Sequence, residues 1–329
     1  MRIAVFGAGA VGGCLAARLS LAGEDVVVFA RGEHGAAIRQ RGLILRDEIN
    51  GEQHAANVRF AATAAEAGPV DAVIVATKAH HQADAARAIE PLLDGDQPVV
   101  FAANGIPWWY GANVDLPGVT PATDPARLML DPDGDISRIV SLDRVIGCVI
   151  FSPNKIVEPG IIENKASVNR FELGAVDAAG EVHVPKLLAA FEPTGLPVSG
   201  GEPIRIPLWR KLQFSMCIAP LAALTGLTNG QLHADDGICR LIKDMEREGL
   251  AIASAHGIEL EPAPGVPGAG LAPNHKNSML QDVERGVRVE FEPAVGLLGR
   301  YAQAAGIATP SLDTVAALLK AKLTGAGLI

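Results

Sequence analysis

The chain opens with MRIAVFGAGAVG, residues 1–12, and this stretch decides which fold we expect. A short apolar run over residues 3–6 leads directly into the pattern Gly7-x-Gly9-x-x-Gly12, and an alanine-rich amphipathic stretch follows it. A strand, a glycine turn and a helix in this order are the setting in which G-x-G-x-x-G binds a dinucleotide. In that setting the first glycine allows the tight turn, the second lets the backbone approach a pyrophosphate, and the third lets the helix pack close to the strand.

The start of the expected helix is suited to an anion. Its exposed N–H groups and the positive end of its dipole both favour phosphate. A plain glycine-rich turn is the alternative interpretation, which the strand before the motif and the helix after it disfavour. We therefore predict that a dinucleotide cofactor is held by Gly7, Ala8, Gly9, Ala10, Val11 and Gly12.

Length and composition indicate a two-domain cytoplasmic protein. The chain has 329 residues, of which 49% are hydrophobic, so it is long enough for two domains and a substantial core. No apolar run reaches the roughly 20 residues that a membrane span needs. The N-terminus also lacks the regions of a signal peptide, because glycine interrupts its apolar strand within a few residues. We expect no membrane association.

Charge, cysteine and histidine content argue against other classes of function. A net charge of −9 disfavours a nucleic-acid surface, which would need clustered Lys and Arg. The cysteines are widely separated and form no C-x-x-C pair, which indicates buried thiols: Cys14, Cys148, Cys217 and Cys239. The histidine pair His80-His81 occupies adjacent positions, which rarely chelate one ion, so we expect no metal site.

Buried strands alternate with helices in the first part of the chain. Residues 25–30, 71–77 and 98–102 are continuous apolar runs, and an alanine-rich helix is expected over residues 82–93. This alternation is typical of a doubly wound sheet. Further strands are expected to extend the same sheet, at residues 144–151, 160–163 and 170–173. We therefore predict a Rossmann-type domain over residues 1–200.

Residues 201–329 are predicted to form an all-helical second domain, so that the fold class is α/β with a helical C-terminal part. The expected helices cover residues 206–224, 235–255, 278–285, 292–305 and 310–323. Thr309 is the expected cap of the last helix, with Pro310 at its first position. The apolar face of residues 238–250 suits the domain core or the interface of a homodimer equally well.

Two segments are expected to be loops. Residues 115–137 are rich in Pro, Asp and Gly, and residues 261–274 read EPAPGVPGAGLAPN. Loops of this length inside compact domains are often lids or binding loops.

The nucleotide preference is predicted from the end of the second strand. NAD-binding units usually place an Asp or Glu there to hold the ribose 2′-hydroxyl. In this chain the strand ends with Val28-Phe29-Ala30-Arg31, and no acid occupies that place. The planar, multi-donor head of Arg31 is suited to a 2′-phosphate. We therefore expect NADP(H) rather than NAD(H), with a solvent-facing loop arginine as the alternative interpretation.

Four further segments make the chain resemble the ketopantoate reductase family (2-dehydropantoate 2-reductases), and they occur here in the same order as in that family. They are residues 77–79 (Thr-Lys-Ala), 103–105 (Ala-Asn-Gly), 208–212 (Leu-Trp-Arg-Lys-Leu) and 278–282 (Ser-Met-Leu-Gln-Asp), the last followed by Glu290. The resemblance covers essentially the whole chain. It implies an NADP-binding N-terminal domain, a helical domain, and a substrate held between them.

The resemblance also implies roles for individual residues. Lys211 resembles the family's catalytic lysine and Glu290 its substrate-binding acid. Asn104 resembles the asparagine beside the nicotinamide and the reacting carbonyl, and Ser278 the serine that contacts the substrate carboxylate. The positions that the family uses toward the cofactor are occupied by Arg31, Lys78 and Asn104.

These residue types suit hydride transfer to a ketone. A hydride arriving at the carbonyl carbon leaves negative charge on oxygen, and an ammonium group such as that of Lys211 supplies both a proton and electrostatic support. Glu290 is suited to accept a hydrogen bond from a substrate hydroxyl, or to hold Lys211 in place. Without the resemblance, the ordinary interpretations are favoured: Lys211 as a helix-face lysine, Glu290 as a helix-start acid and Asn104 as part of a turn.

Several residues differ from those of family members that reduce ketopantoate. Helical spacing places Lys211, Ser215 and Ala219 on one face, where those members tend to carry asparagines at the last two positions. Ser215 is therefore expected to contact the substrate in a roomier, less polar pocket. Residues 108–110, Trp-Trp-Tyr, are expected to add aromatic bulk at the reacting end of the substrate.

Three functions follow as hypotheses. The first is NADPH-dependent reduction of a 2-keto acid with Lys211 as general acid, foremost 2-dehydropantoate to (R)-pantoate in pantothenate biosynthesis. The second is a D-2-hydroxyacid dehydrogenase, or a reductase of a bulkier 2-keto acid, which Ser215, Ala219 and the tryptophans favour. The third is a non-catalytic NADP-binding sensor, against which the retention of Lys211 and Glu290 speaks.

Overall fold

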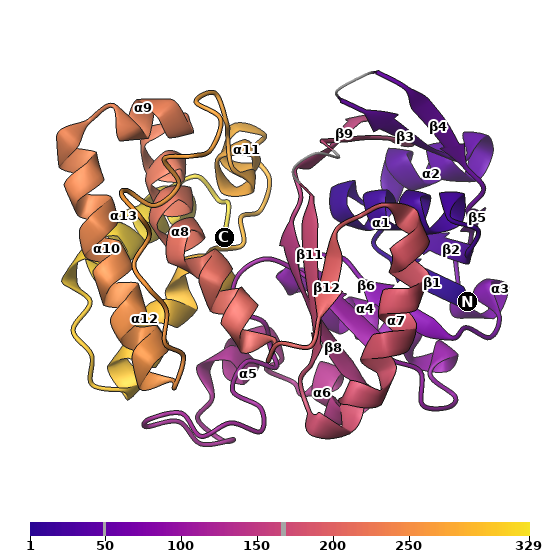
Figure 1. Cartoon of the computed structure of the whole chain (residues 1–329), viewed down its shortest axis with the longest axis horizontal. Helices are drawn as coiled ribbons and strands as arrows, with labels where there is room; N and C mark the ends of the chain where they lie inside the picture. Colours follow the sequence, from indigo (N-terminus) through magenta and orange to yellow (C-terminus); the bar gives the residue numbers. More distant parts are fainter. Residues whose placement is uncertain (49–50, 166–168) are drawn as a thin grey trace. The chain divides into compact units, whose positions relative to one another are not determined.

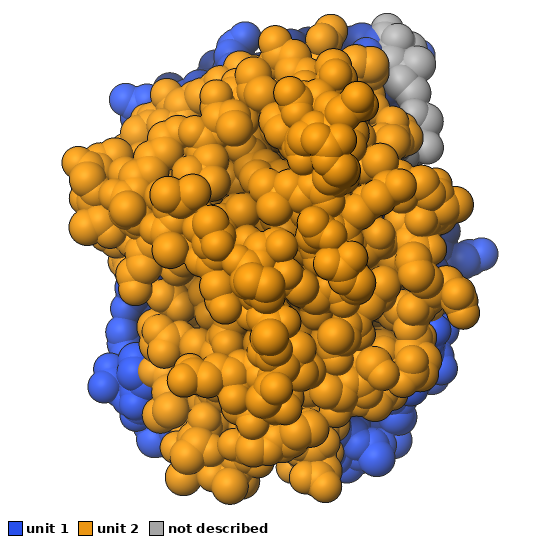
Figure 2. Space-filling model, turned by 90° about the vertical axis from the view of Figure 1, so that its left-hand side faces the viewer, with its two compact units in different colours: residues 1–104, 131–204 blue, residues 105–130, 205–329 orange. Residues whose placement is uncertain are grey.

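A computed structural model of the chain describes residues 1–48, 51–165 and 169–329. These residues fall into two compact units, shown as cartoon in Figure 1 and coloured separately in Figure 2. Unit 1 comprises Met1–Asn104 and Asp131–Ile204, and unit 2 comprises Gly105–Leu130 and Arg205–Ile329. From the sequence we expect Gly105–Leu130 in the N-terminal domain, whereas the structure groups this segment with unit 2.

The main sheet of unit 1 is of the Rossmann type, which confirms the predicted fold class. Its eight strands lie in the order β12-β11-β8-β7-β6-β1-β2-β5. All neighbouring pairs are parallel except β11 and β8. Their bounds are β1 Arg2–Phe6, β2 Asp25–Phe29, β5 Arg59–Phe60, β6 Ala72–Val75, β7 Val99–Ala102, β8 Val145–Phe151, β11 Arg170–Ala175 and β12 Val198–Gly200. The central strands β6 and β7 are buried at every residue, as expected for a parallel sheet covered on both faces.

A second, four-stranded sheet in unit 1 corrects one prediction. Its order is β4-β3-β10-β9, with bounds β3 Leu43–Asp47, β4 Gln53–Ala56, β9 Asn154–Glu158 and β10 Ile161–Asn164. The prediction that residues 160–163 extend the main sheet is wrong, because β10 pairs with β3 and β9 instead. Buried and half-buried residues alternate along β10, which is the pattern of a strand with one covered face rather than two.

Helix α1, Ala10–Leu21, lies between the two sheets. It contacts β1 and β2 of the main sheet and all four strands of the second sheet. Its small side chains permit this double contact: a Cβ atom at Gly13 would lie 2.9 Å from the Ile162 side chain of β10. The alanine-rich composition of α1 therefore reflects burial on both sides rather than one apolar stripe.

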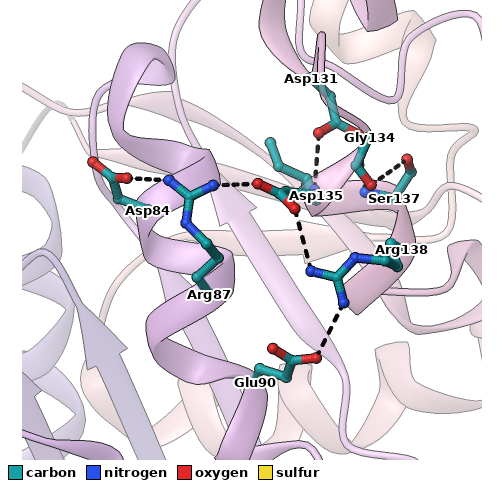
Figure 3. A network of polar contacts seen from close by, with 9 residues as sticks. Asp84, Arg87, Glu90, Asp131, Gly134, Asp135, Ser137 and Arg138 are labelled. Atoms are coloured by element: carbon teal, nitrogen blue, oxygen red, sulfur yellow. Dashed lines mark hydrogen bonds and ion pairs between the residues drawn. The ribbon is translucent and has the colours of Figure 1, made fainter.

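The remaining helices of unit 1 are short, and a polar network links two of them. Their bounds are α2 Gly32–Arg41, α3 Ala64–Ala67, α4 Gln82–Ile89, α6 Asp135–Ile139 and α7 Val184–Phe191. In Figure 3, Arg87 of α4 reaches Asp135 of α6, and Arg138 lies between Asp135 and Glu90. The two guanidinium groups, Arg138 foremost, hold the pKa of Asp135 below its usual range. Because the arginines and Glu90 are solvent-exposed, their ion pairs with the half-buried Asp135 stabilise the fold only modestly.

Unit 2 is built around one long helix, α8, Arg205–Thr225, against which most of its other helices pack. These have the bounds α5 Pro125–Leu130, α9 Asn229–His233, α10 Asp236–Ala255, α11 Ser278–Glu284, α12 Leu297–Ala304 and α13 Pro310–Gly325. The all-helical character of this part is confirmed. At the crossing of α8 and α10, a Cβ atom at Gly249 would overlap the end of the Met216 side chain. Among the described residues, no helix has the length and apolar character to cross a membrane.

The cap of α13 differs from the prediction. The helix begins at Pro310 as expected, but the side chain of Thr309 makes no capping hydrogen bond. The buried carboxylate of Glu248, from α10, takes that role instead. It accepts hydrogen bonds from the backbone amides of Ser311 at 2.9 Å and Leu312 at 2.8 Å. A side chain distant in sequence thus satisfies the orphan donors of the first turn and places negative charge at the positive end of the helix.

Replacing Glu248 by Ala should lower the free energy of unfolding by about 2 kcal/mol, because two helix-terminal amides lose a charged acceptor in a buried place. Thr309→Val is the matched control and should cost less than Glu248→Ala, since the Thr309 side chain makes no capping hydrogen bond. Urea denaturation followed by circular dichroism measures both values. If Thr309→Val lowered the free energy of unfolding more than Glu248→Ala, Thr309 rather than Glu248 would be the cap of α13.

Candidate functional site

Four neighbouring strands of unit 1 end at one edge of the main sheet, and each is followed by a residue predicted to bind the cofactor. The strands β7, β6, β1 and β2 are adjacent and parallel, so their carboxyl ends lie together. Asn104 follows β7, Lys78 follows β6, Gly7 follows β1 and Arg31 follows β2. The chain continues from β1 to β2 on one side and returns to β6 on the other. Such a topological switch point is where open α/β sheets bind ligands.

The three motif glycines play different parts in the structure. Gly7 has a φ of +92°, and a Cβ atom there would lie 2.7 Å from the Thr77 side chain. A Cβ atom at Gly12 would overlap the carbonyl oxygen of Gly7. At Gly9, by contrast, the nearest atom to an added Cβ is the Gly7 oxygen at 3.9 Å. The fold itself requires Gly7 and Gly12, while Gly9 leaves open space over the start of α1.

The amides at the start of α1 are arranged for an anion. Those of Gly7 and Ala8 both donate to the carbonyl of Phe29, at 3.0 and 2.9 Å, and Ala8 is completely buried. Those of residues 10–12 belong to the first helical turn and have no acceptor within the helix. In the described part of the chain no side chain caps this end, and the first turn contains no acidic residue. The backbone of residues 10–12 is therefore the part of the motif best suited to phosphate.

Arg31 and Lys78 add positive charge along this edge. Arg31 precedes α2 in an extended conformation and is exposed, and no described carboxylate pairs with its guanidinium. Lys78 is half-buried and precedes the 3₁₀ turn Ala79–His81. Asn104 is exposed and is the last residue of unit 1 before Gly105. The charges of Arg31 and Lys78 and the amides in the first turn of α1 all suit an anionic cofactor.

His34 is a residue of this region that sequence reasoning missed. It lies on the first turn of α2, and its Nε2 atom is 2.8 Å from the carbonyl oxygen of Ala8. Its Nδ1 atom accepts a hydrogen bond from the amide of Gly160 at 3.0 Å. Burial lowers the pKa of His34 below its usual value. No sequence pattern indicated this contact, because it joins three segments that are far apart in the chain.

In unit 2 the predicted substrate residues lie on α8 and on elements packed against it. Lys211, Ser215 and Ala219 follow one another on α8 at four-residue intervals, and all three are half-buried. Ser278 is the exposed first residue of α11. Glu290 is half-buried and directly precedes the helix that starts at Phe291. Both α11 and that helix contact α8.

The helix after Glu290 starts with an irregular turn that holds the segment following Asn104. Residues Glu292–Gly296 form a π-helical turn, a rare feature that often accompanies functional sites. The amide of Ile106 donates to the carbonyl oxygen of Pro293 at 2.7 Å. A Cβ atom at Gly105 would overlap that same carbonyl. Unit 2 thus fixes Gly105 and Ile106 on the turn that Glu290 introduces.

Arg205 explains why residues 105–130 belong to unit 2. Its guanidinium donates to the carbonyls of Tyr110 at 2.9 Å and Ala112 at 2.6 Å, and lies 5.7 Å from the ring centre of Trp109. Trp109 and Tyr110 are 2% and 0% exposed. All three aromatic side chains of residues 108–110 are buried, and the ring of Tyr110 is enclosed within unit 2. Their predicted place at the reacting end of the substrate stays a prediction.

A buried chain of hydrogen bonds continues from Tyr110. Trp209 donates its indole N–H to the Tyr110 hydroxyl at 2.7 Å, and that hydroxyl lies 2.6 Å from Nδ1 of His256. Because indole can only donate, the hydroxyl proton is directed to His256. The other ring nitrogen of His256 is buried and has no hydrogen-bond partner among the described residues. Burial lowers the pKa of His256 to about 4.

The long loop over residues 261–274 is tied to α9. Asn229 donates to two carbonyls of the loop at 3.1 and 3.3 Å, and the amide of Gly230 donates to a third at 2.7 Å. Nε2 of His233 lies 2.9 Å from a fourth loop carbonyl. The loop is irregular, as predicted from its Pro and Gly content, but α9 holds much of its backbone in place.

Three other features of the described residues bear on possible sites. An open hollow of about 280 Å³ in unit 2 is lined by the π-helical turn, α12 and α13, with Arg300 and Lys320 among its lining residues, and contains none of the predicted residues. No cluster of three or more His, Cys, Asp or Glu side chains in the described ranges is placed to hold a metal ion. The four cysteines are free, and burial raises the pKa of the Cys14 thiol to about 12.

Comparisons with known proteins agree for both parts of the chain. Residues 3–109 match the family model described as Ketopantoate reductase PanE/ApbA, and residues 204–323 match the one described as Ketopantoate reductase PanE/ApbA C terminal. A curated 2-dehydropantoate 2-reductase of Mesorhizobium japonicum is 37% identical over 324 residues, which cover 97% of this chain and 97% of that protein.

Solved structures with the same fold include two kinds of enzyme. A putative ketopantoate reductase of Ralstonia solanacearum MolK2 matches with a TM-score of 0.88 at 31% identity, covering 100% of this chain and 99% of that one. A ternary structure of D-mandelate dehydrogenase with NADH and anilino(oxo)acetate matches with a TM-score of 0.84 at 21% identity, covering 100% of both chains. At 21% identity, the similarity to D-mandelate dehydrogenase shows a shared fold and does not by itself indicate a shared substrate.

The buried His256 predicts a pH dependence of stability. Its pKa is lowered from 6.5 to about 4 in the folded chain, so between these values the unfolded chain binds more protons. The contribution of neutral His256 is therefore complete above pH 6.5 and is lost as the pH falls toward 4. His256→Asn keeps an acceptor for Tyr110 but does not titrate.

Urea denaturation of both proteins at pH 7, 5.5 and 4 measures this effect. Relative to the variant, the wild-type free energy of unfolding should fall on acidification by up to about 3 kcal/mol. Parallel pH profiles for the two proteins would mean that His256 titrates normally.

Proposed function

The chain belongs to the ketopantoate reductase family of oxidoreductases, and on this basis we propose that it reduces a 2-keto acid with NADPH. The first candidate reaction is 2-dehydropantoate to (R)-pantoate, a step of pantothenate biosynthesis. The observation that carries this proposal is the 37% identity, over nearly the whole length of both proteins, to a curated 2-dehydropantoate 2-reductase. The chain also carries the residue types that the family resemblance implies, both for the nucleotide and for the substrate.

The choice of NADPH rests on the carboxyl edge of the main sheet. The pyrophosphate is proposed to lie over the open space at Gly9, against the amides of residues 10–12. Arg31 follows β2, where an acid would hold the 2′-hydroxyl of NADH, and its exposed guanidinium is suited to a 2′-phosphate. Lys78 adds a second cation at the neighbouring strand end.

The chemistry is proposed to rest on side chains of unit 2. NADPH, when bound, supplies the hydride that adds to the carbonyl carbon. Lys211 gives a proton to the carbonyl oxygen, so that the ketone becomes an alcohol, and its charge stabilises the negative oxygen on the way. Ser278 binds the substrate carboxylate, and Glu290 accepts a hydrogen bond from a substrate hydroxyl or orients Lys211. Asn104 is proposed to contact the reacting carbonyl.

A second candidate function is favoured by the wall of α8 next to Lys211. Ser215 and Ala219 are half-buried and shorter than the asparagines of family members that reduce ketopantoate. A shorter and less polar wall suits a bulkier 2-keto acid, such as one with an aromatic side chain. The enzyme would then act as a D-2-hydroxyacid dehydrogenase in the reverse direction. A non-catalytic NADP-binding sensor is the third reading, which the presence of Lys211 and Glu290 disfavours.

A substrate screen that follows NADPH absorbance tests the proposed reaction. Ketopantoate should give the highest kcat/KM when compared with 2-ketoisovalerate and phenylglyoxylate. Lys211→Ala should lower kcat by about 10² or more with little change in NADPH affinity, because it removes the proton donor and not the nucleotide site. Lys243→Ala, an exposed lysine on α10, is the matched control and should leave kcat unchanged.

The same screen separates the alternatives. A kcat/KM for phenylglyoxylate far above that for ketopantoate would favour the second candidate function. Tight NADPH binding without oxidation by any 2-keto acid would favour the sensor. Near-normal turnover of Lys211→Ala would remove this lysine from the mechanism.

A pair of glycine variants tests the position of the pyrophosphate. Gly9→Ala adds a methyl group that meets no protein atom closer than 3.9 Å, so the fold should keep its melting temperature within about 2 °C. The methyl would instead obstruct the pyrophosphate, and NADPH affinity should fall about tenfold or more. Gly12→Ala should destabilise the fold by about 2 kcal/mol or more, because its Cβ overlaps the Gly7 carbonyl. Unchanged NADPH affinity of Gly9→Ala would place the pyrophosphate elsewhere.

A further inference from the structure

We propose that His34 is a positioning residue that fixes the glycine turn relative to Arg31 and thereby sets the preference for NADPH over NADH. The proposal rests on the proposed nucleotide site and deepens it. NADPH and NADH share the pyrophosphate and differ in the ribose 2′-phosphate, so discrimination requires the pyrophosphate site and Arg31 to be held at one fixed separation.

The contacts of His34 determine its tautomer. The carbonyl oxygen of Ala8 can only accept, so Nε2 of His34, 2.8 Å away, carries a proton and donates it. The amide of Gly160 can only donate, so Nδ1, 3.0 Å away, is unprotonated and accepts it. A neutral imidazole satisfies both partners at once. Through these two hydrogen bonds, His34 of helix α2 links the glycine turn to the turn between β9 and β10 of the second sheet.

The bond to Ala8 controls the turn that precedes α1. Ala8 lies between the first two motif glycines, and its amide already donates to Phe29 of β2 at 2.9 Å. His34 holds the carbonyl of the same residue, so both polar groups of Ala8 are fixed by protein. Because the carbonyl is directed toward α2, it does not point its negative end at an anion over residues 10–12.

The position of His34 on α2 links this turn to Arg31. His34 lies on the first turn of the helix, three residues after Arg31 at the N-cap, and the helix start is held by a hydrogen bond from the amide of Gly35 to the carbonyl of Arg31 at 3.1 Å. A Cβ atom at Gly35 would overlap the carbonyl of Ala30, so the helix sits tightly against the end of β2. A shift of the glycine turn relative to α2 therefore changes the separation between the anion site and the Arg31 backbone.

The test is a double-mutant cycle on nucleotide selectivity. Dissociation constants for NADPH and NADH are measured for the full chain as wild type, His34→Ala, Arg31→Ala and the double variant. His34→Ala should lower the ratio Kd(NADH)/Kd(NADPH) by about fivefold or more, and Arg31→Ala should lower it further. If His34 acts through Arg31, the ratio of the double variant should equal that of Arg31→Ala alone.

Two additional variants separate positioning from folding. His34→Gln retains one donor and one acceptor, so it should keep most of the wild-type ratio. His54→Ala removes a partly exposed histidine of β4 in the same unit and should leave the ratio unchanged. Melting temperatures of all variants identify any loss of folding, and His34→Gln supplies the comparison if His34→Ala unfolds.

The possible results distinguish a failure of the positioning role of His34 from a failure of the proposed function. An unchanged ratio in His34→Ala, an equal loss of affinity for both nucleotides, or full additivity with Arg31→Ala would each overturn the positioning role while leaving the proposed function intact. A ratio in His34→Gln as low as that of Arg31→Ala would overturn it as well. Absence of NADPH binding to the wild-type protein would instead overturn the proposed function, and the positioning role with it.

Discussion

Unit 1 depends on how closely the third motif glycine approaches the first. Gly12 packs so near the carbonyl of Gly7 that any larger residue would overlap it. This contact fixes where α1 begins relative to the end of β1. On its other side α1 rests on the second sheet, where Gly13 meets Ile162. A helix held from both sides presents its first-turn amides in one direction, and a site made of backbone groups can only be as well defined as the packing behind it.

The parts of the fold that local sequence determines were predictable. The strand–turn–helix order of residues 1–12 and the apolar runs near residues 72 and 99 describe buried parallel strands, and the structure contains them. The helices of the second part follow from their length and periodicity. The resemblance named Lys78 and Asn104 and the end of the second strand named Arg31, but only the strand order of the structure shows that they follow adjacent parallel strands.

The parts that depend on distant partners were not predictable. The sequence of a strand as short as β10 does not indicate which sheet it joins. In the structure β10 pairs with β3 and therefore belongs to the second sheet. The cap of α13 is Glu248, which lies about sixty residues before that helix in the chain and on another helix. His34 and Arg205 each join segments that no local pattern connects. Glu248, His34 and Arg205 each bind backbone groups of a segment far away in the chain. The periodicity of a single sequence carries no information about such contacts.

The two units differ in the kinds of group that their predicted residues offer. Unit 1 offers mainly backbone amides and a few cations at strand ends, which suit a cofactor of fixed structure. Unit 2 offers side chains on α8 and on the elements packed against it, of which Lys211 and Ser215 are examples. Side chains on one helix can be exchanged without disturbing the backbone, so under the proposed function Ser215 and Ala219 are positions at which substrate choice could change within one fold.

The placement of Gly105–Leu130 in unit 2 has a consequence for how the chain is made. Neither unit is continuous in sequence, so the ribosome releases this segment roughly a hundred residues before Arg205, its partner on α8. During that interval the aromatic side chains at 108–110 have no core to enter, while unit 1 still lacks β8 and β11. Unit 1 is complete in sequence at Ile204, whereas residues 105–130 must wait for the helices of unit 2, including His256 and Tyr301, which contact Tyr110. The nascent chain therefore carries an unpacked apolar segment in the middle of unit 1 until the second half of unit 2 is made.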